Sequence, residues 1–339
     1  MHWARLREAF RSARRIGILR TDHLGDMVLT LPMVAAVRQL RPEVELLVFA
    51  HPRTKPLVEE QPGITAFVLI SGGMREVWRA LQEWQPEILF FPRPLFEEAW
   101  AAYRAGICYR VGSGYRWYSL LFTHRIYEHR RTAQRHEAEY NVRMVAQAAG
   151  VAELPVRLLP PRISAQAHRR VQEVMSRLGL SPAAFVVLHP GGRGSAPRWE
   201  PESFALLAQR LEGEGMPCVI TGTAAERELA ERIRHRYPAA CLLFGELSMA
   251  EFIALLAQAR VVVANSTGAL HIAAALGVPV VGLYSLLPSH HPRRWGPYTE
   301  RATVLTPPQG APPDAVAAIP VELVEQAVRS WWDSGEAGR

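Results

Sequence analysis

Aspartate and lysine are scarce in this chain of 339 residues. Aspartate supplies four of the 32 acidic residues, and Lys55 is the one lysine among 39 basic residues, so arginine carries nearly all of the positive charge. No Asp-x-Asp sequence occurs, and we therefore predict no carboxylate-held divalent metal ion. Two of the few aspartates, Asp22 and Asp26, nevertheless stand close together in the stretch RTDHLGDMVLTLP.

Cysteine and long apolar runs are also scarce. The three cysteines lie far apart and form no Cys-x-x-Cys pair, which excludes a disulfide framework and a zinc site of that kind. No run approaches the ~20 apolar residues of a membrane-spanning helix. The first residues, MHWARLREAFRSARR, lack the apolar core of a secretory signal. We therefore expect a cytoplasmic protein.

Two phosphate-binding fingerprints are missing, namely Gly-x-Gly-x-x-Gly and Gly-x-x-x-x-Gly-Lys-Ser/Thr. Any bound phosphate must then be neutralised by backbone amides and arginine. The net charge of +7 has two possible origins: selection for binding anionic partners, or a compositional bias of the genome toward arginine that has no functional meaning. Trp3, Leu6 and Phe10 recur at helical spacing among arginines, which predicts a helix that either lies on an anionic membrane surface or packs on the domain.

Strand-like and helical patterns alternate in both halves of the chain, which predicts parallel α/β layers. The expected strands are 15–20, 44–50, 66–70 and 87–91, then 185–190, 217–222, 240–245, 260–266 and 279–285. The expected helices include 26–41, 53–61, 74–84, 94–105, 135–149, 166–179, 201–214, 223–236, 248–259, 267–276 and 320–333. We predict two doubly wound, Rossmann-like domains that face each other across a cleft.

Prolines at 151–163 indicate a linker, so we place the domains at 1–155 and 156–339, with helix 320–333 returning to pack on the first domain. The segment after Val111 is rich in aromatic residues and arginine without clear periodicity. We interpret 112–134 as a long surface excursion of the kind that often carries function.

The strand that ends at Asn265 is followed by residues suited to an anion. Ser266 and Thr267 offer hydroxyls, Gly268 permits close approach, and a helix opens through Ala269 and His271. Free amides and a helix dipole meet there, which favours phosphate or diphosphate. Alternatively, Thr267 caps its own helix and His271 makes a structural hydrogen bond.

A second strand, 185–190, is followed by a loop with glycines and two arginines, Arg193 and Arg198. Guanidinium groups grip phosphate oxygens, although these arginines could also be solvated. In the first half, Asp26 begins the helix after strand 15–20. It is a candidate general base, with Asp22 in a supporting role. The alternative is that Asp26 caps its helix, in which case the capping bonds lower its pKa.

These segments together resemble glycosyltransferase family 9, the heptosyltransferases of the lipopolysaccharide core. The resemblance rests on ILRTDHLGDMVLTLPMVAAVRQLRP, HEAEYNVRMV, VVLHPGGRGSAPRWEPESFALLAQRL, TGTAAERELAERI, the Ser-Thr-Gly-x-x-His segment and RRWGPY, which follow one another in family order. It implies a GT-B architecture and an inverting, metal-independent transfer in which Asp26 is the base. It also implies that Thr267, Gly268, Ala269 and His271 bind diphosphate, that Glu226 holds the donor ribose, and that Leu247 lies near adenine.

The chain departs from the family at two positions. Pro197 stands where lysine is common, so Arg193 or Arg198 would contact the phosphates. Ser266 stands where an aspartate is common, which leaves the donor sugar open.

The leading hypothesis is a glycosyltransferase without a cofactor that uses ADP-heptose and an anionic glycolipid acceptor at the inner face of the cytoplasmic membrane. The acceptor would be received by the excursion through its arginines, namely Arg116, Arg125, Arg130 and Arg131. A sugar-nucleotide epimerase on the same architecture is one alternative. A noncatalytic basic binder of lipid or nucleic acid is another, but it leaves the carboxylate and phosphate sites unexplained, so we expect no nucleic-acid partner.

Overall fold

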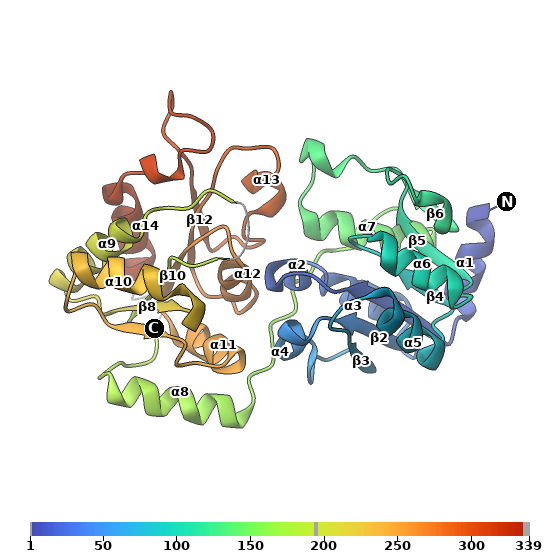
Figure 1. The fold of residues 1–339 in the computed structure, drawn as a ribbon, viewed down its shortest axis with the longest axis horizontal. Helices are drawn as coiled ribbons and strands as arrows, with labels where there is room; N and C mark the ends of the chain where they lie inside the picture. The colour runs from blue at the N-terminus through green and yellow to red at the C-terminus, as the bar shows by residue number, and fades with distance from the viewer. Residues whose placement is uncertain (1, 193–195, 335–339) are drawn as a thin grey trace. The chain divides into compact units, whose positions relative to one another are not determined.

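The computed structural model describes residues 2–192 and 196–334 (Figure 1). The chain divides into two compact units between Arg162 and Ile163. This division lies slightly after the boundary at 155 that we derived from the sequence. Each unit is built on a six-stranded sheet in which all neighbouring strands are parallel. The predicted class, two doubly wound α/β units, is confirmed.

The first sheet has the strand order β3-β2-β1-β4-β5-β6. Its strands are β1 (Arg15–Arg20), β2 (Glu45–Ala50), β3 (Ala66–Leu69), β4 (Ile88–Phe90), β5 (Tyr109–Ser113) and β6 (His124–Ile126). The strand order reverses between β1 and β4, where Ile16 pairs with Ile88. In sheets of this kind the crevice at the carboxyl ends of the strands on either side of the reversal is the usual ligand site.

Helices cover both faces of this sheet. They are α1 (His2–Ser12), α2 (Leu24–Val28), α3 (Pro32–Leu40), α4 (Lys55–Val58), α5 (Met74–Trp84), α6 (Phe96–Arg104) and α7 (Glu137–Ala149), with short 3-10 turns η1 (Pro52–Thr54), η2 (Ser119–Leu121) and η3 (Arg130–Thr132). Helices α5 and α6 pack together, and α7 packs on both α1 and α3. Leu6 and Phe10 of α1 are buried, so the packed alternative for this helix is the one observed.

The second sheet has the order β12-β11-β10-β7-β8-β9, with the reversal between β10 and β7. Its strands are β7 (Val186–His189), β8 (Cys218–Gly222), β9 (Leu242–Phe244), β10 (Val261–Asn265), β11 (Val280–Leu283) and β12 (Ala302–Leu305). The helical segments are α8 (Ala165–Arg177), α9 (Pro201–Gly213), η4 (Ala224–Glu226), α10 (Arg227–Arg236), α11 (Met249–Gln258), α12 (Gly268–Ala275), α13 (Pro292–Trp295), η5 (Val316–Ala318) and α14 (Val321–Ser334).

The carboxy-terminal helix α14 packs within the second unit. It contacts α9 and the strands β10, β11 and β12, and its residues Val324 and Val328 join the core formed with Trp199 and Phe204. The apolar face of α14 is therefore used in its own unit, and packing of this helix on the first domain stays a prediction.

Local structure differs from the sequence-based prediction in two ways. The helix expected at 26–41 is broken into α2 and α3, because Pro32 lacks a backbone N–H and begins a new helix instead of continuing the first one. The excursion after Val111 is not irregular throughout, since it contains β6, which pairs with β5. Strands β5, β6 and β12 were all missed. They are short and partly polar, and it is pairing with a neighbouring strand that stabilises them.

Candidate active site

The carboxyl edge of the first sheet gathers charged side chains from three elements. Strand β1 ends at Arg20 and leads into Asp22 and Asp26, the latter in the first turn of α2. Helix α7 contributes Glu137 from its own first turn. The loop between β4 and α6 contributes Arg93. These segments meet beside the point of strand reversal.

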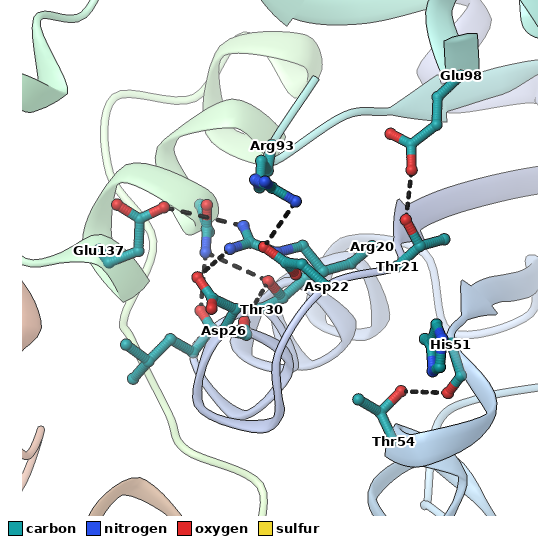
Figure 2. A network of polar contacts seen from close by, with 12 residues as sticks. Arg20, Thr21, Asp22, Asp26, Thr30, His51, Thr54, Arg93, Glu98 and Glu137 are labelled. Carbon is teal, nitrogen blue, oxygen red and sulfur yellow. Dashed lines mark hydrogen bonds and ion pairs between the residues drawn. The ribbon is translucent and has the colours of Figure 1, made fainter. Parts of the chain in front are cut away.

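The guanidinium of Arg20 forms the centre of this group (Figure 2). Its side chain is 2% exposed. Nε donates to Oδ1 of Asp22 over 2.6 Å, and Nη2 donates to Oδ1 of Asp26. Nη1 faces Oε1 of Glu137 at 3.9 Å. We call these four residues, Arg20, Asp22, Asp26 and Glu137, the Arg20 cluster.

Two further arginines complete the charge balance of the Arg20 cluster. Nη1 of Arg93 lies 3.5 Å from Oδ2 of Asp22, and Nη1 of Arg130 lies 2.5 Å from Oε1 of Glu137. Three guanidinium groups thus oppose three carboxylates. Such pairing is needed because a buried charge without a partner is strongly destabilising.

Asp26 differs from the other two carboxylates in its exposure. Its side chain is 17% exposed, against 5% for Asp22 and 2% for Glu137. Burial raises the pKa of Asp26 above its ordinary value; Arg20 opposes this rise, and the charges of Asp22 and Glu137 add to it. Asp26 is thus a carboxylate that retains some access to solvent and has an increased affinity for a proton.

The alternative in which Asp26 caps its helix, with capping bonds that lower its pKa, is not observed. The residue that caps α2 is His23, whose side chain makes no capping hydrogen bond, and Asp26 lies inside the first turn. The carboxylate of Asp26 is turned to Arg20, while its backbone oxygen accepts a hydrogen bond from Oγ1 of Thr30 over 2.8 Å. The pKa therefore reflects burial instead of capping.

A fourth carboxyl group, that of Glu98, lies at the same edge of the sheet. Its Oε1 accepts a 2.5 Å hydrogen bond from Oγ1 of Thr21, while Oε2 is buried without a hydrogen-bond partner among the described residues (Figure 2). Burial raises the pKa of Glu98 to about 7, although the bond from Thr21 opposes the rise. Near neutral pH this group is therefore divided between its two charge states.

The sequence did not single out Arg20, Arg93, Glu98 or Glu137 as site residues. The sequence did contain one indication of two of these residues. Glu98 and Glu137 stand in the first turns of α6 and α7, and each of these helices follows a strand of the first sheet. A carboxylate in that position lies at the carboxyl edge of a parallel sheet.

The four arginines predicted to contact the acceptor occupy different environments. Arg130 contacts the Arg20 cluster through Glu137. Arg125 is half-buried and its Nε donates to the carbonyl oxygen of Ser119 over 3.1 Å. Arg116 and Arg131 are exposed. Two of the four therefore serve internal contacts.

The carboxyl edge of the second sheet is organised around Glu226. Its Oε1 accepts a hydrogen bond from the amide of Gly192 over 2.9 Å, and its Oε2 accepts bonds from the amide and hydroxyl of Thr223, each over 2.8 Å. Burial opposes ionisation, but the bonds from Thr223 and Gly192 and the nearby His189 lower the pKa of Glu226 below its ordinary value. Glu226 is thus an ionised, firmly oriented acceptor of hydrogen bonds.

Two glycines let the loop after β7 pass through a narrow space. A Cβ at Gly191 would overlap the carboxylate of Glu226, and a Cβ at Gly192 would lie 2.8 Å from Cγ2 of Thr267. The loop therefore passes close to both residues: a side chain at Gly191 would disturb Glu226, and one at Gly192 would disturb Thr267.

Asn265 fixes both ends of this loop, a role that the sequence did not reveal. Its Oδ1 accepts a bond from the amide of Trp199 and its Nδ2 donates to the carbonyl oxygen of Pro190, each over 2.9 Å. Arg198 is exposed, with Nη1 3.3 Å from the carbonyl oxygen of Gly192. Arg193, the other arginine predicted to bind phosphate, lies outside the described residues.

The turn between β10 and α12 carries the remaining predicted donor residues. Thr267 stands at the cap position of α12 but makes no capping hydrogen bond, and its Oγ1 is buried without a hydrogen-bond partner among the described residues. The capping alternative is therefore not observed. Gly268 and Ala269 begin the helix, where backbone N–H groups lack partners within the helix, and His271 is 5% exposed in its first turn. Ser266 and Leu247 are half-buried.

Within 2–192 and 196–334, none of the helices is both long and apolar enough to cross a membrane. Over the same ranges, no group of three or more His, Cys, Asp or Glu side chains is arranged as a metal site.

Comparison with known proteins settles the family. The model of glycosyltransferase family 9 (heptosyltransferase) matches residues 74–322. The chain belongs to glycosyltransferase family 9. It is a glycosyltransferase, and the resemblance seen in the sequence is confirmed.

Individual relatives agree with this assignment. A putative glycosyltransferase of Haemophilus influenzae is 28% identical over 87% of this chain and 90% of its own length. A family 9 glycosyltransferase from Veillonella parvula superposes with a TM-score of 0.85 at 20% identity, covering 95% of this chain and 98% of that protein. The ADP-heptose lps heptosyltransferase II of Escherichia coli gives 0.79 at 22% identity, covering 95% and 99%. These structures confirm the predicted GT-B fold.

Proposed function

We propose that this glycosyltransferase transfers heptose from ADP-heptose to a lipopolysaccharide-core-like glycolipid, with inversion and without a metal ion, and that Asp26 is the general base. The family and the related E. coli protein, named as an ADP-heptose heptosyltransferase, support the substrate class. The observation that carries the choice of base is the environment of Asp26. It is the most exposed carboxylate of the Arg20 cluster, lies at the carboxyl end of β1, and has a raised pKa.

In the proposed reaction, Asp26 accepts the proton of an acceptor hydroxyl while that oxygen forms a bond to the anomeric carbon of the donor. The bond from this carbon to the diphosphate breaks, and the nucleoside diphosphate leaves with the electron pair. The amides that open α12, the hydroxyl of Thr267 and the side chain of Arg198 would hold the diphosphate, and Glu226 would hold the ribose.

The acceptor would meet the first unit at its exposed arginines, Arg116 and Arg131, together with Arg125. A glycolipid acceptor would bring the enzyme to the cytoplasmic face of a membrane, where basic side chains favour anionic headgroups. Because Ser266 stands where the family commonly has aspartate, a related sugar nucleotide is compatible with the same mechanism.

The test compares turnover and donor binding in one set of variants. Asp26→Asn should lower turnover of ADP-heptose by roughly 10²–10⁴-fold, as expected for a positioned base, while ADP-heptose still raises the melting temperature. Asp333→Asn, at an exposed aspartate of α14, is the matched control and should behave as wild type.

Full turnover by Asp26→Asn would show that Asp26 is structural. Stabilisation by UDP- or GDP-sugars alone would refute the donor. Product formation without an acceptor would indicate an epimerase.

A further inference from the structure

One nitrogen of the Arg20 cluster has an unusual environment. Nη1 of Arg20 is buried without a hydrogen-bond partner among the described residues, although Oε1 of Glu137 faces it at 3.9 Å. That same oxygen lies 2.5 Å from Nη1 of Arg130. The carboxylate of Glu137 is therefore bound to Arg130 and stops short of hydrogen-bonding distance from Arg20.

Arg130 is held in place by side chains of α7. Its Nη1 donates to Oδ1 of Asn141 over 3.0 Å, its guanidinium carbon lies 5.4 Å from the ring centre of Tyr140, and Nη2 lies 3.4 Å from Sδ of Met144. This arrangement leaves Arg130 only 20% exposed. An arginine from the excursion is thus built into the helix that carries Glu137.

The same scaffold reaches the backbone around Asp26. Asn141 also donates, through Nδ2, to the carbonyl oxygen of Leu29 over 2.9 Å. Leu29 follows the last residue of α2 and caps that helix, and Thr30 next to it donates to the backbone oxygen of Asp26. The position of Arg130 is therefore fixed relative to Asp26 as well as to Glu137.

We propose that Arg130 is a positioning residue for Asp26: by holding Oε1 of Glu137 away from Nη1 of Arg20, it reserves the guanidinium of Arg20 for Asp26. This inference depends on the proposed function only for the role of Asp26 as the base. The effect passes through Glu137 and Arg20, and Arg130 need not touch the substrate.

The electrostatic consequences have a definite sign. Without the cation at Arg130, the buried carboxylate of Glu137 loses that partner and is drawn toward Nη1 of Arg20, which weakens the pair between Arg20 and Asp26. Both effects disfavour the ionised form of Asp26, so its pKa should rise further. Removal of the negative charge of Glu137 should lower the pKa of Asp26.

Several charged groups influence Asp26, and of these only Glu137 and Arg130 are changed in the test below. The charged groups that act on Asp26 directly are Arg20, Asp22, Glu137 and His23. Groups one contact further away are Arg93, which pairs with Asp22, Arg130, which pairs with Glu137, and Glu98, which accepts from Thr21.

The scarcity of aspartate makes a direct measurement possible. Protein labelled with carbon-13 at the aspartate carboxyl contains four labelled groups, and two of them, Asp314 and Asp333, are exposed and serve as references. Asp26→Asn assigns the signal of Asp26. Its titration in the full-length protein then reports the protonation of this carboxylate without any substrate.

Arg130→Gln should raise the titration midpoint of Asp26, and Glu137→Gln should lower it, each by about one pH unit, a tenfold change in proton affinity. The double variant Arg130→Gln with Glu137→Gln should return the midpoint to near the wild-type value, because a whole ion pair has been removed. Such opposite shifts with mutual compensation are not expected from general loosening of the fold.

Arg131→Gln, at the exposed neighbour in η3, is the matched control and should leave the midpoint unchanged. Equal midpoints in Arg130→Gln and Arg131→Gln would overturn the proposal.

If Arg130→Gln does not fold, Arg130→Lys, which keeps the charge, should titrate like wild type, and Glu137→Gln alone must still lower the midpoint. If these titrations contradict the role of Arg130, the proposed glycosyl transfer is not affected. If Asp26→Asn keeps full turnover, Asp26 is not the base, but the titration results for Arg130 and Glu137 still hold.

Discussion

The amide of Gly192 donates a hydrogen bond to Oε1 of Glu226 over 2.9 Å, and this bond joins the loop after β7 to the turn after β8. Thr223 occupies the other oxygen of Glu226 with two donors. The carboxylate is therefore oriented before a ligand arrives. A carboxylate has about four acceptor positions and three are occupied here, so one remains for a ligand hydroxyl. Preorganisation of this kind reduces the entropic cost of binding.

Glu226→Gln should weaken ADP binding by roughly tenfold or more. The substitution removes the negative charge and converts one acceptor into a donor, so a charge-assisted bond to a ribose hydroxyl is lost. Calorimetric titration with ADP measures the change. Glu228→Gln, at an exposed position in α10, should bind ADP as wild type does. Equal affinities in Glu226→Gln and wild type would exclude Glu226 from the nucleotide site.

Gly192→Ala should lower ADP affinity by about fivefold while the protein still folds. The added Cβ would lie 2.8 Å from Cγ2 of Thr267, so Thr267 must leave its preferred conformation, at a cost on the order of 1 kcal/mol. The hydroxyl of Thr267 would turn with it. The same titration with ADP tests this. Gly213→Ala is the control, because a Cβ there meets nothing within 4 Å. Unchanged affinity would place the phosphates elsewhere.

Glu98 should make folding stability depend on pH in the neutral range. The folded protein keeps this proton up to a pKa of about 7, whereas the unfolded chain releases it near the ordinary value of 4.5. Between these values the folded state binds more protons, so the free energy of unfolding falls as the pH rises.

Glu98→Gln removes this pH dependence. Relative to wild type, the variant should gain up to roughly 3 kcal/mol of stability between about pH 4 and about pH 8. Urea unfolding at both pH values measures the change. Glu97→Gln, an exposed neighbour in α6, should show no such gain. If the difference in free energy of unfolding between Glu98→Gln and wild type does not change with pH, the pKa of Glu98 is not raised in the folded protein.

The sequence predicted the fold through patterns that are local. The run VVVAN is buried along its length in β10, and RIGILR is buried from Ile16 onward in β1. A strand buried on both faces reads as a continuous apolar run, which is why the parallel sheets were recognisable. Strand β6, with only three residues, depends on its partner β5 and gave no such pattern.

The candidate site was predictable only where it is local in the chain. Asp26 and the turn from Ser266 to His271 each follow a strand directly, so their place at a sheet edge could be inferred. The residues that contact them could not be inferred from the sequence. Arg20 meets Glu137, and Asn265 meets Trp199, through contacts that join segments far apart in the chain.

The sequence by itself determined the two α/β units, the family and the segments that bear the chemistry, because hydrophobic periodicity and contiguous motifs act over short stretches. Tertiary structure decided the charge states. It placed Arg20 among three carboxylates, paired Arg130 with Glu137, and raised the pKa values of Asp26 and Glu98 through burial. Burial and Coulomb energies depend on distances in space, and these are fixed only when the chain has folded.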